Sequence, residues 1–252
     1  MSTMVQDHKA IWLSPTVFTW APFVDASTEF KQEPWKRSHA LFLHAEQILN
    51  NATTDDERAD AIVALRRAIN SRVRLLDQRY SFRRLPIKDK PSDVLGLLAF
   101  VGLVRPRMLR KLIDIRDAIE HKDVVPPDAE ACSVLLEFTW YFLKSTDFIT
   151  QRVIDTISFT DEENGCWVEL GINPPDRWEP RVRGWVPSRL ISSEAYDGWL
   201  LLQVKRLEKR EKNADPADGG FGNESCDRFF QADVRGPAEA LRELYRLYFE
   251  MV

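Results

Sequence analysis

The chain has 252 residues, of which 44% are hydrophobic and 29% charged, and its formal net charge is −4. This composition is typical of a globular protein with enough apolar mass for a core, and it excludes a chain that is disordered throughout. No apolar run approaches the roughly 18 residues that a membrane-spanning helix needs, so we expect no membrane association.

Residues 1–35 lack a helical period and are rich in aromatic residues and prolines, so we predict an irregular N-terminal arm that packs on the body. Apolar residues at helical spacing predict a first helix over residues 36–51. A second amphipathic helix is expected from the cap residue Thr54 to about Phe82, with arginines beside its apolar stripe.

Three further helices are predicted before the pattern changes. Residues 94–104 form a short apolar helix, and Pro106 opens the next one, which ends near residues 121–123. The last helix of this series spans about 128–155. Long amphipathic helices with short links predict an antiparallel bundle over residues 36–155.

After residue 156, short apolar runs alternate with turn-forming residues, which is typical of strands. The expected strands span residues 157–160, 166–171, 182–187 and 199–205, and they are followed by a loop at 213–223 and a helix from Pro237. We therefore predict a mainly α fold in three parts: an arm (1–35), a helical bundle (36–155) and a small α+β C-terminal unit (156–252).

Charge is distributed unevenly along the chain. From Arg58 to Arg116 there are fifteen Lys or Arg and five Asp or Glu, a balance of +10 that leaves −14 for the rest. Such a sector can attract phosphates, and arginine grips a phosphate with two parallel hydrogen bonds. A solvated basic face, or ion pairs with the acidic C-terminal half, would explain it equally well. The candidate RNA-binding residues are Arg66, Arg67, Arg72 and Arg74.

The cysteines Cys132, Cys166 and Cys226 are odd in number and far apart, so we expect neither a disulfide framework nor a metal site. The first ten residues also lack the basic-then-apolar layout of a secretion signal. The expected location is the reducing cytoplasm.

His121 is the histidine with the most informative neighbours, whereas His8, His39 and His44 are predicted to be structural or exposed. Asp117 lies four residues before His121, so the two side chains can meet on one helix face, where the carboxylate would orient the ring and favour its protonated form. Arg116 and Glu120 form a second pair with the same spacing beside the first, and two exposed ion pairs at a helix end would also explain the pattern. A proton-transferring group and a cation suit RNA cleavage without a metal, and two chains related by a two-fold axis would supply two of each.

The segment from Arg116 to His121 resembles the Arg-polar-x3-His signature of the HEPN superfamily (higher eukaryote and prokaryote nucleotide-binding domain), with Asp117 where Asn is common. The helical arrangement of residues 36–155 resembles that family too, with the motif at the end of the third core helix. The resemblance implies an HEPN-like bundle and a metal-independent endoribonuclease that works by 2′-hydroxyl attack, without a cofactor. Arg116 would bind the scissile phosphate, His121 would transfer protons, and Asp117 would hold His121.

The resemblance also implies partners: an RNA substrate, a second copy of the chain through the bundle, and an antitoxin or phage-defence protein. One alternative is a non-catalytic module that dimerises or binds a partner. Four tryptophans in the C-terminal region would support it, but core packing explains them equally well: Trp167, Trp178, Trp185 and Trp199. A third option is that the basic sector binds a nucleotide or a signalling oligonucleotide.

Overall fold

The structure is a computed structural model, and it describes residues 10–31, 33–122, 124–174, 177–209 and 225–251. The chain divides into two compact units. We call them the helical unit (residues 29–83 and 90–153) and the sheet unit (residues 1–28, 84–89 and 154–251). Among the described residues, no helix is long and apolar enough to cross a membrane.

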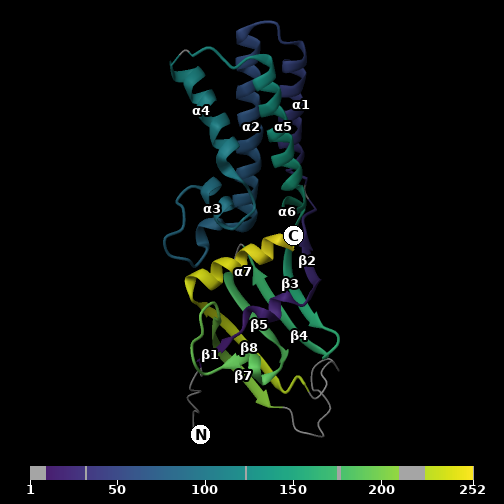
Figure 1. The fold of residues 1–252 in the computed structure, drawn as a ribbon. Coiled ribbons are helices and arrows are strands. Elements are labelled where there is room, and N and C mark those ends of the chain that lie inside the picture. Colours follow the sequence, from purple (N-terminus) through teal and green to yellow (C-terminus); the bar gives the residue numbers. More distant parts are fainter. Residues whose placement is uncertain (1–9, 32, 123, 175–176, 210–224, 252) are drawn as a thin grey trace, which may run out of the picture. The chain divides into compact units, whose positions relative to one another are not determined.

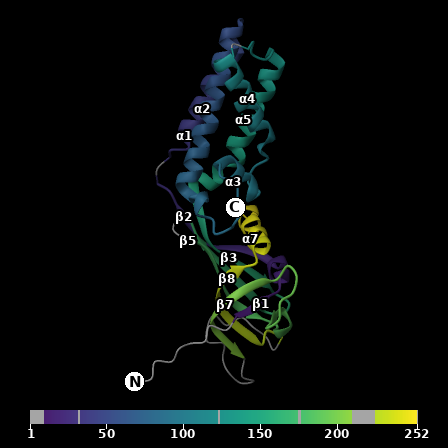
Figure 2. The ribbon, with the colours of Figure 1, turned by 90° about the vertical axis from the view of Figure 1, so that its left-hand side faces the viewer.

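Four long helices build the helical unit, and they lie alongside one another (Figures 1 and 2). They are α1 (Lys36–Asn51), α2 (Asp55–Tyr80), α4 (Pro106–Lys122) and α5 (Ala129–Ser145), accompanied by the shorter α3 (Val94–Phe100) and α6 (Asp147–Gln151). A short 3-10 turn, η2 (Phe82–Arg84), follows α2. Helix α2 contacts α1, α4 and α5 and is therefore the central element of this unit.

Local sequence signals set the beginnings of these helices. At the start of α2, the Thr54 hydroxyl accepts a hydrogen bond from the Glu57 backbone at 3.3 Å, and the Glu57 carboxylate accepts one from the Thr54 backbone at 3.0 Å. This reciprocal capping box satisfies donors that a helix end leaves without partners. Asp128 caps α5 in a similar way, because its carboxylate accepts a hydrogen bond from the Ala131 backbone at 2.8 Å.

Much of the apolar stripe predicted for the second helix forms the core of this unit. Ile62, Leu65, Ile69, Leu76 and Tyr80 of α2 are buried. Phe138 of α5 lies outside this core, since it is 40% exposed. The helix predicted over 128–155 is also shorter than expected, because α5 ends at Ser145, α6 ends at Gln151 and a strand begins at Arg152.

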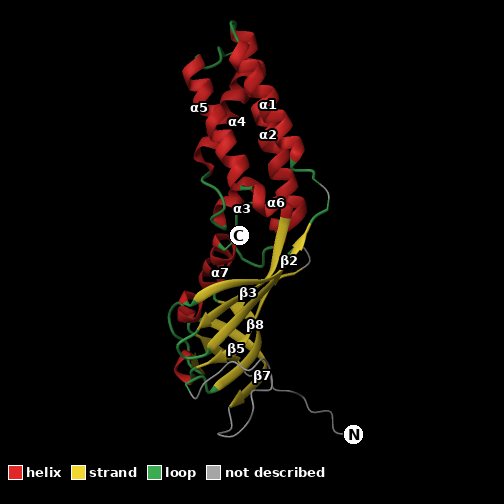
Figure 3. Cartoon of the chain, turned by 90° about the vertical axis from the view of Figure 1, so that its right-hand side faces the viewer, coloured by secondary structure: helices red, strands yellow, loops and turns green. Residues whose placement is uncertain are grey.

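The sheet unit is built on an eight-stranded sheet, whose strands are yellow in Figure 3. The strand order is β2-β3-β4-β5-β8-β7-β1-β6. The strands are β1 (Ala10–Leu13), β2 (Ala21–Glu29), β3 (Arg152–Asp161), β4 (Cys166–Asn173), β5 (Arg177–Val186), β6 (Ile191–Ser192), β7 (Leu200–Lys209) and β8 (Arg228–Gly236). The 3-10 turns η1 (Pro15–Thr19) and η3 (Ser188–Leu190) lie between strands. Strand β4 shows the alternation of a half-buried strand, since every second side chain from Cys166 to Ile172 is buried.

Helix α7 (Ala238–Glu250) packs on one face of the sheet (Figure 2). The Tyr245 hydroxyl donates to the backbone oxygen of Trp178, and the Tyr248 hydroxyl donates to that of Ile154 at 2.6 Å. The Tyr245 and Trp178 rings meet edge to face at 5.5 Å. These contacts place the tyrosine rings in the core while their hydroxyls keep hydrogen-bond partners.

The predicted fold class, a mainly α HEPN-like bundle followed by a small α+β unit, is wrong. The eight-stranded sheet is a major part of the architecture, and it takes in strands from both ends of the chain. The segment expected to be an irregular arm contains β1 and β2, of which β1 pairs with β7 and β6. The predicted loop at 213–223 lies outside the described residues.

The expectation that the cysteines stay unpaired is also wrong for two of them. Cys166 and Cys226 form a disulfide with their Cα atoms 5.6 Å apart, although 60 residues separate them in sequence. Strand order explains this, since β4, which begins at Cys166, and β8, which begins two residues after Cys226, both pair with β5. Cys132 is a free, buried cysteine on α5.

Candidate functional site

The Arg116–His121 segment forms the last part of helix α4, as predicted. Leu109 and Leu112 anchor the helix, because both are buried on its inward side. Arg116 and Asp117 are half-buried, whereas His121 is exposed near the end of the helix. The motif therefore lies on a packed element, with its histidine accessible to a ligand.

Asp117 brings together two arginines from different helices. Its Oδ1 atom accepts a hydrogen bond from Nη1 of Arg66 on α2 at 2.5 Å and another from Nη1 of Arg116 at 3.0 Å. The Arg66 and Arg116 side chains are 22% and 23% exposed, so both are partly accessible to solvent. The carboxylate thus holds two guanidinium groups side by side.

This arrangement changes the electrostatics of Asp117. The hydrogen bond from Arg116, together with the charge and hydrogen bond of Arg66, holds the pKa of the Asp117 carboxyl below its usual value. A partial loss of hydration opposes this shift. Guanidinium groups suit an anionic ligand such as a phosphate, because each can donate two parallel hydrogen bonds.

His121 was expected to pair with Asp117. The Asp117 oxygen described above instead accepts hydrogen bonds from the two arginines. The i, i+4 spacing still places His121 on the same side of α4, one turn further along. The structure therefore brings Arg66, Arg116 and Asp117 into contact and leaves His121 as an exposed neighbour.

The arginines of α2 fall into distinct environments. Arg67 and Arg74 are exposed, and Arg66 belongs to the cluster around Asp117. Arg72 is fully buried, which contradicts its prediction as an RNA-binding residue. Its guanidinium donates hydrogen bonds at 2.7–3.2 Å to Ser38, Leu143, Thr146 and Asp147. Arg72 is therefore a structural residue.

Two of the remaining histidines can be placed. His39 lies with its Nε2 atom 2.8 Å from Oδ1 of Asp147, the carboxylate oxygen that also accepts from Arg72. His39 thus belongs to the structural network of the helical unit. His44 is exposed on α1, and His8 lies outside the described residues.

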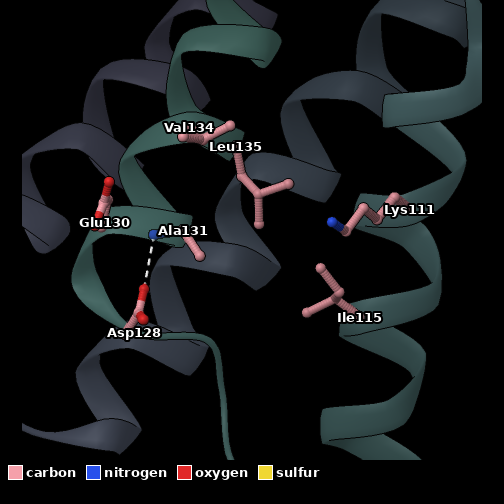
Figure 4. Close-up of a pocket in the computed structure, with 7 residues that line it drawn as sticks. All are labelled: Lys111, Ile115, Asp128, Glu130, Ala131, Val134 and Leu135. Atoms are coloured by element: carbon pink, nitrogen blue, oxygen red, sulfur yellow. Dashed lines mark hydrogen bonds between the residues drawn. The ribbon is translucent and has the colours of Figure 1, made fainter.

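A groove between α4 and α5 lies next to the motif, and nothing in the sequence predicted it. Its cavity volume is about 330 Å³, and Figure 4 shows Lys111 and Ile115 of α4 facing the α5 residues Ala131, Val134 and Leu135 across it. Ile115 immediately precedes Arg116, so the groove adjoins the cationic cluster. The groove itself carries both signs of charge, because Lys111, Asp128 and Glu130 all line it.

The outer side of α5 carries exposed apolar residues. Val134 is 45% exposed, Phe138 40% and Tyr141 62%, and they lie four and then three residues apart on one helix face. Trp140 is 41% exposed and meets the Tyr141 ring edge to face at 5.0 Å. These residues form a second apolar stripe on α5, and their helical spacing could have been recognised in the sequence.

Among the residues that the structure describes, no group of three or more His, Cys, Asp or Glu side chains is placed to hold a metal ion.

Comparison of the chain with protein-family models, with curated proteins and with solved structures finds no match.

Proposed function

We propose that the helical unit binds RNA at the Arg66–Asp117–Arg116 cluster and cleaves it with the help of His121. The observation that carries the proposal is the convergence of two guanidinium groups on one carboxylate, beside an exposed histidine. The motif resemblance to the HEPN superfamily supports the same activity. Arg67 and Arg74, which are exposed on α2, would guide the RNA backbone.

In the proposed reaction, the 2′-hydroxyl oxygen attacks the neighbouring phosphorus and the bond from phosphorus to the 5′-oxygen breaks. A base takes the proton of the 2′-hydroxyl, and an acid protonates the leaving 5′-oxygen. The products are a 2′,3′-cyclic phosphate and a 5′-hydroxyl. Arg66 and Arg116 would stabilise the charge that develops on the phosphate, and Asp117 would keep their guanidiniums in position.

One His121 cannot act as base and acid in the same step, so we propose that two copies of the chain form the site. A second copy contributes a second His121, one acting as base and the other as acid. The exposed apolar residues of α5 provide a surface for such a contact. We further propose an antitoxin or phage-defence protein as a partner of the chain.

The test is cleavage of a labelled single-stranded RNA in the presence of EDTA. We expect His121→Ala to lower the rate by about 10²–10⁴-fold, the usual contribution of a positioned proton-transferring group. His44→Ala is the matched control, because His44 is also exposed and lies on α1. Equal cleavage by wild type and a correctly folded His121→Ala variant would refute the proposal.

A second candidate is a non-catalytic binding module, which the exposed apolar face of α5 favours. It predicts a partner protein that co-purifies with the chain and is lost when Tyr141→Asp places a charge on this face. Induced expression separates the two candidates. The ribonuclease predicts growth arrest and RNA fragmentation that require His121 and Arg116, whereas the binding module predicts that neither variant changes growth.

A further inference from the structure

The sheet unit holds a cavity with a volume of about 790 Å³. It lies over strands β2, β3 and β4 and the turn between β3 and β4. Its volume falls in the range of about 300–1,000 Å³ that is common for small-molecule sites. No residue of the Arg66–Asp117–Arg116 cluster lines it, so it is independent of the proposed RNA site.

The strand register places the cavity on one face of the sheet. Trp167 lies opposite Thr160, and Glu169 lies opposite Ser158, so these side chains share a face. Their neighbours Ile157, Phe159 and Val168 point to the other face, where they are fully buried. The cavity therefore lies on the side of the sheet away from this core.

Two aromatic side chains line the cavity. Phe23 on β2 is 63% exposed, which is unusual for a large apolar side chain. Trp167 on β4 is half-buried and packs against a core cluster that contains the disulfide Cys166–Cys226 and Trp185. Trp167 thus packs on this core cluster and also contributes to the cavity surface.

The polar lining is acidic. Asp25, Asp161, Glu162 and Glu169 line the cavity, and no lysine or arginine is among its described lining residues. Arg183 compensates Glu169 through two hydrogen bonds of 2.9 and 2.7 Å.

Within the part of the chain that the structure describes, no lysine or arginine forms an ion pair with the other acidic groups of the lining. Asp25 accepts a hydrogen bond from the Ser158 hydroxyl, and Asp161 accepts one from the Asn164 side chain at 2.8 Å. These neutral donors orient the two carboxylates but leave their charge, and Glu162 is exposed. The cavity thus combines an aromatic surface with an excess of negative charge.

From this combination we infer that the cavity binds a small organic ammonium ion with an apolar body. The ammonium group would lie among Asp25, Asp161 and Glu162, and the apolar body would lie against Phe23 and Trp167. Tryptophan is the best aromatic partner for a cation, and carboxylates supply charge-assisted hydrogen bonds. The same charges would repel an anionic ligand such as a nucleotide.

Calorimetric titration of the full chain with phenethylamine tests the inference, because this amine is a cation at neutral pH. Its neutral analogue 2-phenylethanol and the anion phenylacetate are the comparison ligands. We expect saturable binding of the amine, with an affinity at least about tenfold higher than that of the alcohol. A tenfold ratio is what one charge-assisted hydrogen bond would contribute. No saturable binding of the anion is expected.

Neighbouring acids provide a matched pair of variants. Glu162→Gln removes a lining carboxylate and should weaken amine binding about fivefold or more, whereas Glu163→Gln, next to it but outside the lining, should leave it unchanged. Phe23→Ala, on an exposed strand, should weaken binding of both amine and alcohol. Equal affinity for amine and alcohol, equal effects of the two Glu variants, or no saturable amine binding in the millimolar range would each overturn the inference.

Discussion

Arg72 offers a sharp test of how the helical unit is stabilised. Its side chain is fully buried and donates five hydrogen bonds, including one of 2.7 Å to Asp147. The substitution Arg72→Met keeps an unbranched apolar stem of similar shape but removes every donor. The backbone oxygen of Leu143 then loses its hydrogen bond from Arg72, and Asp147 loses its buried cationic partner.

The expected loss of stability follows from the fate of Asp147. Removing one partner of a buried ion pair costs about 3–5 kcal/mol, because the remaining charge is left without compensation. Asp147 is 20% exposed and also contacts His39, so part of its charge stays solvated or paired. We therefore expect the lower end of that range, about 3 kcal/mol.

Urea unfolding followed by far-UV circular dichroism measures this loss, because the helices dominate that signal. With a urea dependence of about 2 kcal/mol per molar, the unfolding midpoint should fall by about 1.5 M. Arg74→Met is the matched control on the same helix, and because Arg74 is exposed its effect should stay within about 0.5 kcal/mol. Equal midpoints for the two variants would refute a buried structural role for Arg72.

Three further predictions concern a helix cap, a carboxylate and the disulfide. Thr54→Ala removes the capping box of α2 and should lower the free energy of unfolding in urea by about 1 kcal/mol. An unchanged free energy of unfolding would mean that the cap is not formed. Because folding lowers the pKa of Asp117, Asp117→Asn should be less stable than wild type at pH 7, and this difference should shrink as the pH falls below the ordinary aspartate pKa of about 3.9. A pH-independent difference would contradict the Asp117 contacts. Denatured, unreduced protein should show one reactive thiol, Cys132, and reduction of the 60-residue disulfide loop should cost about 4 kcal/mol. Three reactive thiols would exclude the disulfide.

The sequence alone determined the helices of the central region. The helix over residues 36–51 is confirmed, and the one expected from Thr54 to Phe82 is α2, which ends at Tyr80. Helical periodicity and end caps act between residues three to five positions apart, so they can be read from a single stretch of chain. For the same reason the position of the Arg116–His121 segment at the end of a helix was predictable.

Only the tertiary structure decided the features that join distant residues. Strand β1 pairs with β7, and Cys166 forms a disulfide with Cys226. Asp117 accepts a hydrogen bond from Arg66, which lies 51 residues earlier on another helix. Arg72 and Arg74 are alike in sequence, yet one is buried and the other exposed, because burial depends on which helices pack against each face of α2. Local sequence patterns determine the elements, whereas strand partners, disulfides and ion pairs depend on how those elements pack.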